Sequence, residues 1–404
     1  MDSRLRVSVC GKCDEAAACL GSRAVLIASR DAFAHECGAQ PGRPMNFRKF
    51  LLTIHLVGGL VAAIFLILLG VSGGLLVFEG EIDHRLNSQL SFVHPQGTRL
   101  SLNALTEKLE RAHAGGKIVS LMLPTHDDLA INATLRQTQG TLTVAVNPYT
   151  GEELGSLASA NTFTRKLHQF HTNLLLGPTG KLITVTAAIF LLGLSLSGLV
   201  LWWPRRLWRL SGSASGRQRN FELHNVLGVY ASVFMLLFAL TAIVIHWDDP
   251  ARTWINQLAG QSDPPPGGKP SPAPAGTALL GPDELSAIAT KTVPGAKVTG
   301  LMNLGTAGNA ARVAMKFPED GTPLGRTNLY LDPTTGQVLS ALTSRSGSLG
   351  FRMVKLWNRE IHTGDIGGWP TRILACVASF TLPLLALTGP LIWWGRVRRR
   401  SAVE

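Results

Sequence analysis

Two stretches decide the fold, His171-Thr-Asn-Leu-Leu-Leu-Gly-Pro-Thr-Gly-Lys181 and His362-Thr-Gly-Asp-Ile-Gly-Gly-Trp-Pro-Thr-Arg372, because each places a histidine ahead of a long apolar run. In both, a basic residue follows ten positions after the histidine, and the first residue of a Trp-Trp pair follows 31 positions after it. The runs end in Ser197-Gly-Leu-Val-Leu-Trp-Trp203 and Thr388-Gly-Pro-Leu-Ile-Trp-Trp394. Such self-similarity indicates a tandem repeat.

A second pair of histidines opens two further apolar runs. These begin with Arg48-Lys-Phe-Leu-Leu-Thr-Ile-His55 and Arg217-Gln-Arg-Asn-Phe-Glu-Leu-His224, and a hydroxyl residue, Ser72 or Thr241, follows 17 positions after each histidine. The repeating unit is therefore helix, soluble insert, histidine, helix, and it occurs twice.

The composition is that of a membrane protein. The chain of 404 residues is 46% hydrophobic and only 16% charged, and its mean hydropathy is +0.19, which is too apolar for an ordinary soluble protein of this size. Four apolar runs, at roughly 51–78, 182–203, 223–245 and 373–394, are long enough to cross about 30 Å of hydrocarbon. The sequence predicts an α-helical integral membrane protein, a four-transmembrane-helix bundle built from a tandem repeat.

The basic residues predict the orientation of the bundle. A net charge of +12 could suggest nucleic acid, but the Lys and Arg side chains gather beside helix ends, so we expect no nucleic-acid partner. By the positive-inside rule these ends are cytoplasmic. Both termini are then cytoplasmic and both inserts periplasmic, in a bacterial inner membrane, with the lipid bilayer as a partner. The basic clusters are Arg43, Arg48 and Lys49, then Arg205, Arg206, Arg209, Arg217 and Arg219, then Arg396, Arg398, Arg399 and Arg400.

The expected domain organisation follows from these runs. Four of the five cysteines lie in the first 44 residues, and Cys10-x-x-Cys13 has no second pair to complete a zinc site, so we expect a structural or incidental role for them. The expected segments are a disordered extension or mis-called start at 1–44, transmembrane helices at 45–78, 171–203, 221–246 and 362–395, periplasmic inserts at 79–170 and 247–361, a cytoplasmic connector at 204–220 and a basic cytoplasmic tail at 396–404.

The two inserts show matching patterns. In the first, a helix at 102–114 precedes alternating strands at 117–123, 129–136 and 140–146, then a turn at Asn147-Pro-Tyr-Thr-Gly151. In the second, a Pro/Gly/Ser linker at 263–275 precedes a helix at 282–292, strands near 296–303, 312–316 and 327–331, and the turn Asp332-Pro-Thr-Thr-Gly336. Each insert is therefore predicted to be a small α+β domain, a helix packed on an antiparallel sheet.

The four repeated histidines predict a shared cofactor. Ionisable residues in or beside transmembrane segments are costly and indicate function. Since parallel repeats are related by an axis along the membrane normal, His55 and His224 can clamp one iron near the cytoplasmic face, and His171 and His362 another near the outer face. No Cys, Asp or Glu shares the spacing, so haem is favoured over zinc or copper.

Other residues could support these sites. Flat rings or neighbouring helices could approach the backbone at Gly58, Gly59, Gly73, Gly74, Gly193, Gly198, Gly228 and Gly389. Propionates of the outer haem could pair with Arg165, Lys181, Arg359 and Arg372, although each of these could equally be an interfacial anchor. Three histidines without a repeat partner, His84, His168 and His246, are alternative ligands.

From residue 45 to about 400 the sequence resembles the PepSY-associated transmembrane family, also called iron-regulated membrane proteins, which includes ferric siderophore reductases. The motifs that carry the resemblance are Arg48-Lys-Phe-x-x-x-x-His55, His171-x-x-Leu-Leu-Leu-Gly177, Ser197-Gly-Leu-Val-Leu-Trp-Trp-Pro204, Leu223-His-x-x-Leu-Gly228, His362-Thr-Gly364, Leu387-Thr-Gly-x-x-x-Trp-Trp394 and the two Pro-x-Thr-Gly turns of PepSY-like inserts.

The resemblance implies an oxidoreductase with two b-type haems that passes electrons outward to a periplasmic ferric siderophore or other ferric chelate and releases Fe(II). The connector at 204–220 is too short for a flavin or nicotinamide domain, so the electron donor is expected to be a separate reductase or a quinol. Two alternatives stay open. The inserts could bind or regulate a secreted protein, with the helices as an anchor, or the chain could transport a siderophore or haem.

Overall fold

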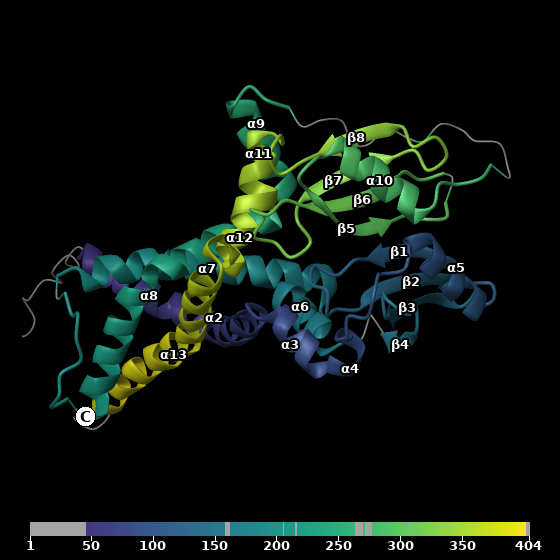
Figure 1. Ribbon diagram of the computed structural model, residues 1–404. Coiled ribbons are helices and arrows are strands. Elements are labelled where there is room, and N and C mark those ends of the chain that lie inside the picture. Colours follow the sequence, from purple (N-terminus) through teal and green to yellow (C-terminus); the bar gives the residue numbers. More distant parts are fainter. Residues whose placement is uncertain are drawn as a thin grey trace, which may run out of the picture. The chain divides into compact units, whose positions relative to one another are not determined.

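The computed structural model describes residues 46–157, 162–204, 206–214, 216–262, 270, 277–306 and 308–400. The expected extension at 1–44, with its four cysteines, and most of the linker at 263–275 lie outside the described residues. Figure 1 shows the elements and their labels.

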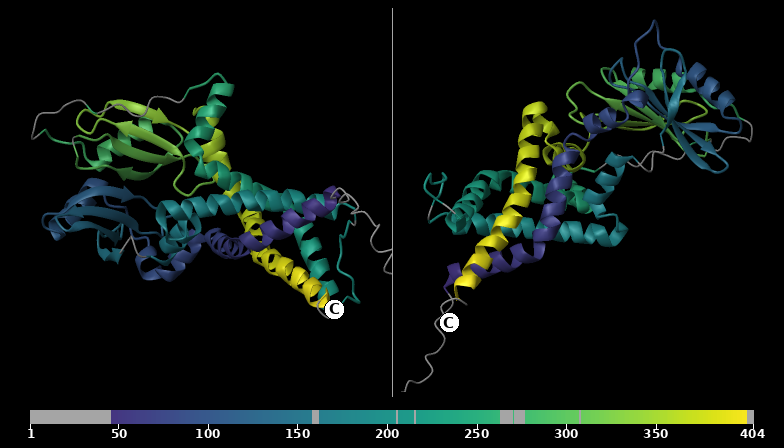
Figure 2. Two further views of the ribbon diagram at one scale, coloured as in Figure 1. Left: turned by 180° about the vertical axis from the view of Figure 1, so that it is seen from behind. Right: turned by 90° about the horizontal axis from the view of Figure 1, so that it is seen from below.

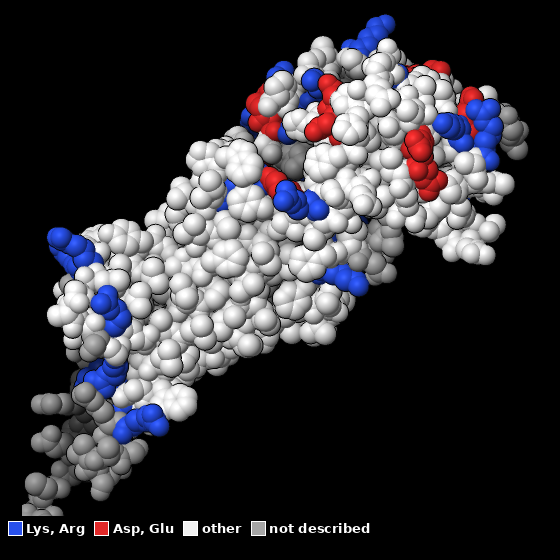
Figure 3. Space-filling model, turned by 60° about the horizontal axis from the view of Figure 1, so that its bottom comes forward, with Lys and Arg blue, Asp and Glu red and all other residues white. Residues whose placement is uncertain are grey.

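Among the described residues, four helices are long and apolar enough to cross a membrane: α2 (Phe47–Leu76), α7 (Gly177–Trp202), α8 (Gly216–His246) and α13 (Trp369–Arg400). Large apolar side chains lie exposed along all four, as expected for helices that face lipid. Figure 3 shows an uncharged surface over the helices, with Lys, Arg, Asp and Glu gathered beyond its two ends. The prediction of an α-helical membrane protein with α+β inserts is confirmed. We call the end of the bundle that joins the inserts the insert end, and the opposite end the basic end.

Small side chains let the four helices pack closely at mid-bundle. Each helix contributes one or more buried alanines to this core. Leucines and one methionine make up the rest of its buried side chains. Helices α2 and α13 lie in close contact at Gly70, whose added Cβ would lie 2.7 Å from Pro383 and 2.9 Å from the carbonyl oxygen of Ser379. The buried members are Ala62, Leu66, Ala187, Leu191, Ala231, Met235, Ala239, Ala378 and Leu382.

The histidines at the insert end lie on short helices that precede the spanning ones. His171 is in α6 (Phe163–Asn173), which Leu174 and Leu175 end with φ of 52° and 60° before α7 begins. His362 is in α12 (Asn358–Thr363), which ends at Gly364 with φ of 81°. The structure thus divides the expected spans 171–203 and 362–395, because left-handed residues break the helix after each histidine.

Both inserts contain the predicted helices and strands and one further strand each. The first consists of α5 (Leu102–Ala112), β1 (Lys117–Met122), β2 (Ile131–Gln137), β3 (Gly140–Val146) and β4 (Glu153–Leu157). The second consists of α10 (Pro282–Thr292), β5 (Lys297–Met302), β6 (Ala311–Lys316), β7 (Thr327–Leu331) and β8 (Val338–Leu342). The strands β4 and β8, which follow the Pro-x-Thr-Gly turns, were not predicted.

The strands of both inserts form one antiparallel sheet with eight strands, in the order β4-β3-β2-β1-β5-β6-β7-β8 (Figure 2). Strands β1 and β5 pair so that Leu121 faces Leu301, and both side chains are fully buried in a core shared by the two inserts. The prediction of two separate small sheets is therefore incomplete: the inserts are joined.

The helices α5 and α10 strengthen this joint by capping each other. The carboxylate of Asp283 accepts from the backbone N–H groups of Leu102 and Asn103, both at 2.9 Å, and the amide oxygen of Asn103 accepts from Asp283 N–H at 3.1 Å. Each helix thus receives a partner for its unpaired N-terminal N–H groups from the other insert.

Short helices connect the inserts to the bundle. After α2 come α3 (Glu79–Leu86) and α4 (Ser88–Ser91), and after α8 comes α9 (Asp248–Leu258). Ahead of α12 lie α11 (Leu349–Phe351) and a π-helical turn, η1 (Arg352–Trp357), and a 3-10 turn, η2 (Asp365–Gly367), precedes α13. These connectors place α6 and α12 at the insert end.

Candidate functional site

At the insert end, the structure brings His171 and His362 together. Their imidazole ring centroids lie 6.4 Å apart, and the ring planes are inclined by 53°. His171 comes from the first repeat and His362 from the second, so the two repeats contribute one imidazole each.

At the basic end, His55 of α2 and His224 of α8 form a second pair with the same separation. Their ring centroids also lie 6.4 Å apart, and the planes are perpendicular at 90°. All four histidines are intermediate between buried and exposed.

The separation suits a metal held between two imidazoles. A metal–imidazole bond of about 2 Å, plus about 1 Å from the nitrogen to the ring centre, puts the centroids of two trans ligands about 6 Å apart. Among the described residues, no group of three or more His, Cys, Asp or Glu side chains could hold a metal ion. Two imidazoles without a third protein ligand fit haem iron better than zinc, which normally takes three or four protein ligands.

Each of the four imidazoles is held by one hydroxyl group. The Nδ1 atom of His171 lies 2.9 Å from Ser72 Oγ, and that of His362 lies 2.7 Å from Thr241 Oγ1. At the basic end, the distances are 2.8 Å from His55 to Ser197 and 2.9 Å from His224 to Thr388.

The hydroxyl groups also fix which imidazole nitrogen carries the proton. Each donates its single proton to the backbone carbonyl four residues earlier in its helix, at 2.5 to 2.8 Å. Since the hydroxyl proton is used there, the oxygen accepts from the Nδ1–H group of the histidine. Nε2 is then unprotonated in all four histidines, which is the state that a metal ligand requires.

The hydrogen bonds of the four imidazoles stay within one repeat, whereas each pair of imidazole rings joins the two repeats. His55 bonds to Ser197 and His171 to Ser72 within the first repeat, while His224 and His362 bond to hydroxyls within the second. The pairs of rings, in contrast, always join the two repeats. Each half of the chain therefore orients its own imidazoles, and the two halves together complete each pair.

Glycines beside three of the hydroxyl residues make room for the rings. An added Cβ at Gly73 would lie 3.0 Å from Cε1 of His171, and one at Gly198 would lie 3.3 Å from Cε1 of His55. At Gly389 the contact with His224 would be an ordinary 3.6 Å. These three glycines were expected to admit flat rings, and the rings that approach them are the imidazoles.

The two pairs lie far apart along the bundle. Helix α2 carries His55 and, 17 residues later, Ser72, the partner of His171. At 1.5 Å per residue, this spacing corresponds to roughly 26 Å along the helix axis. The pairs are thus separated by a distance close to the hydrocarbon thickness of about 30 Å.

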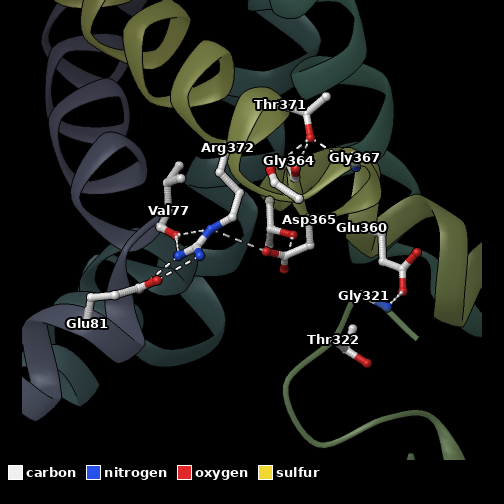
Figure 4. A network of polar contacts seen from close by, with 12 residues as sticks. Val77, Glu81, Gly321, Thr322, Glu360, Gly364, Asp365, Gly367, Thr371 and Arg372 are labelled. Carbon is white, nitrogen blue, oxygen red and sulfur yellow. Dashed lines mark hydrogen bonds and ion pairs between the residues drawn. The ribbon is translucent and has the colours of Figure 1, made fainter. Parts of the chain in front are cut away.

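Of the residues expected to pair with propionates, Arg372 lies in a polar network of its own (Figure 4). Its guanidinium donates to the Val77 carbonyl at 2.7 Å and pairs with Glu81 at 2.7 Å and with Asp365 at 3.6 Å. These contacts tie α13 to α3 and to the end of α2. Arg165, Lys181 and Arg359 are exposed on α6, α7 and α12, and their pairing with a propionate stays a prediction.

The alternative histidines have other neighbours. His168 lies within hydrogen-bond distance of Glu79, with Nδ1 3.2 Å from the carboxylate oxygen, His84 packs against Phe92 with centroids 5.8 Å apart, and His246 packs against Trp247 at 4.8 Å. None of these contacts joins the two repeats, in contrast to those of the four repeated histidines.

The surroundings of three charged groups near the insert end shift their pKa values. The hydrogen bond from Arg372 lowers the pKa of the Glu81 carboxyl. Burial raises the pKa of Glu360, which accepts from the N–H group of Gly321 at 3.0 Å (Figure 4). Burial, with a contribution from Arg359, lowers the pKa of Arg326 to about 10. Glu360 thus links α12 to the second insert through a backbone hydrogen bond.

Residues 52–396 match the family described as the PepSY-associated TM region. The chain belongs to the PepSY-associated TM family. The match spans both repeats, including all four paired histidines and their hydroxyl partners. No curated protein matches the chain. Membership in this family establishes a PepSY-associated membrane protein, in agreement with the four spanning helices.

Sequence reasoning missed the role of the four hydroxyl residues. Ser72 and Thr241 were noted only as markers of the repeat, 17 positions after His55 and His224. Ser197 and Thr388 likewise follow the second histidine of each repeat by 26 positions. A buried hydroxyl repeated at a fixed distance from an intramembrane histidine is the signal that could have identified them.

Proposed function

We propose that this PepSY-associated membrane protein is a di-haem b oxidoreductase that carries electrons across the membrane to a ferric chelate, such as a ferric siderophore, at the insert end. The observation that supports this most is the geometry of the two histidine pairs: each has centroids 6.4 Å apart, joins the repeats and carries a hydroxyl partner on every Nδ1.

A haem bound at each pair would supply reversible one-electron transfer. The protein residues define what surrounds that chemistry. His171 and His362 present unprotonated Nε2 atoms, and Ser72 and Thr241 hold the rings in place. With an imidazole from each repeat to hold it, a bound haem would supply electron transfer rather than binding of oxygen. The buried alanines and leucines at mid-bundle exclude water between the two sites.

The basic end receives the electrons in this proposal, from a separate reductase or a quinol. The basic side chains at the end of α13 and at the start of α8 orient this end toward the cytoplasm by the positive-inside rule. Both inserts then face the periplasm of a bacterial inner membrane. Hard oxygen donors hold Fe(III) far better than Fe(II), so the transfer of one electron weakens the chelate and releases the metal.

A reduced-minus-oxidised absorption spectrum, with pyridine haemochrome quantification of detergent-purified protein, tests this proposal. The expected result is about two b-type haems per chain, re-oxidised by a ferric chelate. Variants His171→Ala and His362→Ala should each lose one haem equivalent, and His55→Ala and His224→Ala should each lose the other. A protein without haem would refute the proposal and favour the anchoring or transport function.

A further inference from the structure

A cavity of about 760 Å³ that opens widely to solvent lies between the first insert and the insert end of the bundle. Three elements line it: α3, the start of α6, and the face of the sheet opposite to α5. Its volume falls within the range of about 300–1,000 Å³ that is typical of small-molecule sites. The lining residues are Glu79, Gly80, Asp83, Met122, Asn132, Thr134, Thr143, Thr162, Thr164, Arg165, His168 and Gln169.

The cavity shares its structural elements with the insert-end histidine pair. His168, which lines the cavity, precedes His171 by three residues on α6, a rise of about 4.5 Å along the helix. Glu79 opens α3 shortly after Ser72, the hydroxyl partner of His171. A molecule that contacts His168 would therefore touch a residue one helical turn from a member of the proposed site of electron exit.

The lining indicates the chemistry of the molecule. Hydroxyl and amide groups of Asn132, Thr134 and Thr143 cover the sheet face, where they can donate to and accept from oxygen-rich ligands. Glu79 and Asp83 provide two carboxylates against one guanidinium, that of Arg165, in the lining. This charge balance disfavours an anion.

The corresponding region of the second repeat is closed by direct packing. There α9 and α11 touch, since the N–H group of Gly350 donates to the side-chain oxygen of Asn256 at 2.8 Å. A Cβ added at Gly350 would lie 2.4 Å from the carbonyl oxygen of Arg252, the residue that corresponds to Asp83. Lys355, which corresponds to Thr164, pairs with Asp248. At these positions the second repeat is therefore packed, whereas the described counterparts Asp83 and Thr164 in the first repeat line the cavity.

We infer that this cavity binds the electron acceptor, a compact hydrophilic ferric chelate that is neutral or cationic. The inference rests on the proposed function and names its substrate site. In the reaction, one electron supplied through the insert-end site reduces Fe(III) in the chelate to Fe(II). No covalent bond forms in that transfer, and the Fe(II) then dissociates from the weakened chelate.

Two tryptophan variants test the cavity with a matched control. Thr143 lines the cavity, while Thr141 lies on the same face of the same strand, two residues away, and does not line it. In Thr143→Trp the indole should fill the cavity, whereas in Thr141→Trp it should not. Ga(III) tris(acetohydroxamate), a neutral complex that cannot accept an electron under these conditions, serves as a binding probe for the full-length protein in detergent.

The expected result is that Thr143→Trp weakens binding of the gallium complex at least about tenfold, while Thr141→Trp binds like the unmodified protein. With the iron complex, Thr143→Trp should raise KM for re-oxidation of the dithionite-reduced protein and leave its haem spectrum unchanged. Equal binding of the gallium complex by the two variants would overturn the cavity assignment, even if the iron complex re-oxidises both.

A charge variant tests the preference for neutral or cationic chelates. Glu79→Gln removes one carboxylate and keeps an acceptor for His168. It should lower KM for the anionic ferric EDTA complex relative to KM for the neutral ferric tris(acetohydroxamate) complex. An unchanged ratio would overturn the charge assignment. If no ferric chelate re-oxidised the unmodified protein while that protein still bound the gallium complex, the proposed function would be refuted and the cavity would remain a binding site.

Discussion

Removal of the hydroxyl group of Thr241 should change the insert-end site alone. Thr241 is buried, and its Oγ1 lies 2.7 Å from Nδ1 of His362 and 2.5 Å from the Leu237 carbonyl. Thr241→Val keeps the shape of the side chain and removes both hydrogen bonds. Thr241→Ser keeps the hydroxyl and removes only a methyl group, so it is the control. Thr388→Val and Thr388→Ser are the equivalent variants at the basic end, since Thr388 holds His224.

The size of the effect follows from the lost hydrogen bond. A buried N–H group without an acceptor costs about 1–3 kcal/mol, and a lost partner of a metal-bound histidine typically lowers metal affinity by about 10–100-fold. The hydroxyl also increases the basicity of the imidazole, which favours Fe(III). If the hydrogen bond is about 0.5–1.5 kcal/mol stronger in the oxidised state, its removal raises the midpoint potential by roughly 20–60 mV.

A spectroelectrochemical titration of the purified protein measures this shift. Thr241→Val should raise the potential of one haem and leave the other unchanged, Thr388→Val should raise that of the other haem, and both serine variants should resemble the unmodified protein. A serine variant that shifts as far as its valine counterpart would show that packing, not the hydroxyl, sets the potential. A shift of both haems by one variant would refute the assignment of hydroxyls to separate sites.

Three further outcomes follow from contacts described above. Gly73→Ala should lower haem occupancy at the insert end because its Cβ would lie 3.0 Å from Cε1 of His171, while Gly389→Ala, with a contact of 3.6 Å to His224, should retain both haems; haemochrome assays compare the two. Asp283→Ala should destabilise the joined inserts by about 1–2 kcal/mol, because two N–H groups at the start of α5 lose their acceptor, and should increase hydrogen exchange in α5. The ion pair with Arg372 lowers the pKa of Glu81 below its ordinary 4.5, so the pair stabilises the fold above that pH and the effect is lost as pH falls through the lowered pKa. Since Glu81 is 43% exposed, the effect should stay below about 1 kcal/mol, and thermal melts of Arg372→Gln should depend less on pH in this acidic range.

The spanning helices and the histidine pairs could be anticipated from the sequence because their signals are strong and local. Long runs of apolar residues directly predict helices that span the membrane. A sequence repeat shows which two distant histidines occupy equivalent positions. His55 with His224 and His171 with His362 were expected to face each other, and the structure brings those residues together. Their role as haem ligands stays a prediction.

Features that depend on contacts between distant parts of the chain could not be predicted from the sequence in the same way. The pairing of Leu121 with Leu301 joins strands from separate inserts, and a strand pattern gives its period but not its partner. Strands β4 and β8 lie at the edges of the sheet, and burial along β8 does not alternate from residue to residue, so the pattern that predicts a half-buried strand is weak there. The cavity needs the placement of α3 against α6, which no local pattern of Glu79 or Asp83 specifies.

The joint between β1 and β5 pairs equivalent residues of the two repeats, as both pairs of imidazole rings do. An ancestor with one repeat could therefore have built the same centres as a symmetric homodimer, with identical subunits facing each other across every contact. The two copies in this chain differ in sequence. Asp83 could then face a cavity while its counterpart Arg252 became packed against Gly350. In the proposed function, such a covalently linked dimer keeps a symmetric path for electrons and still directs them to a single exit.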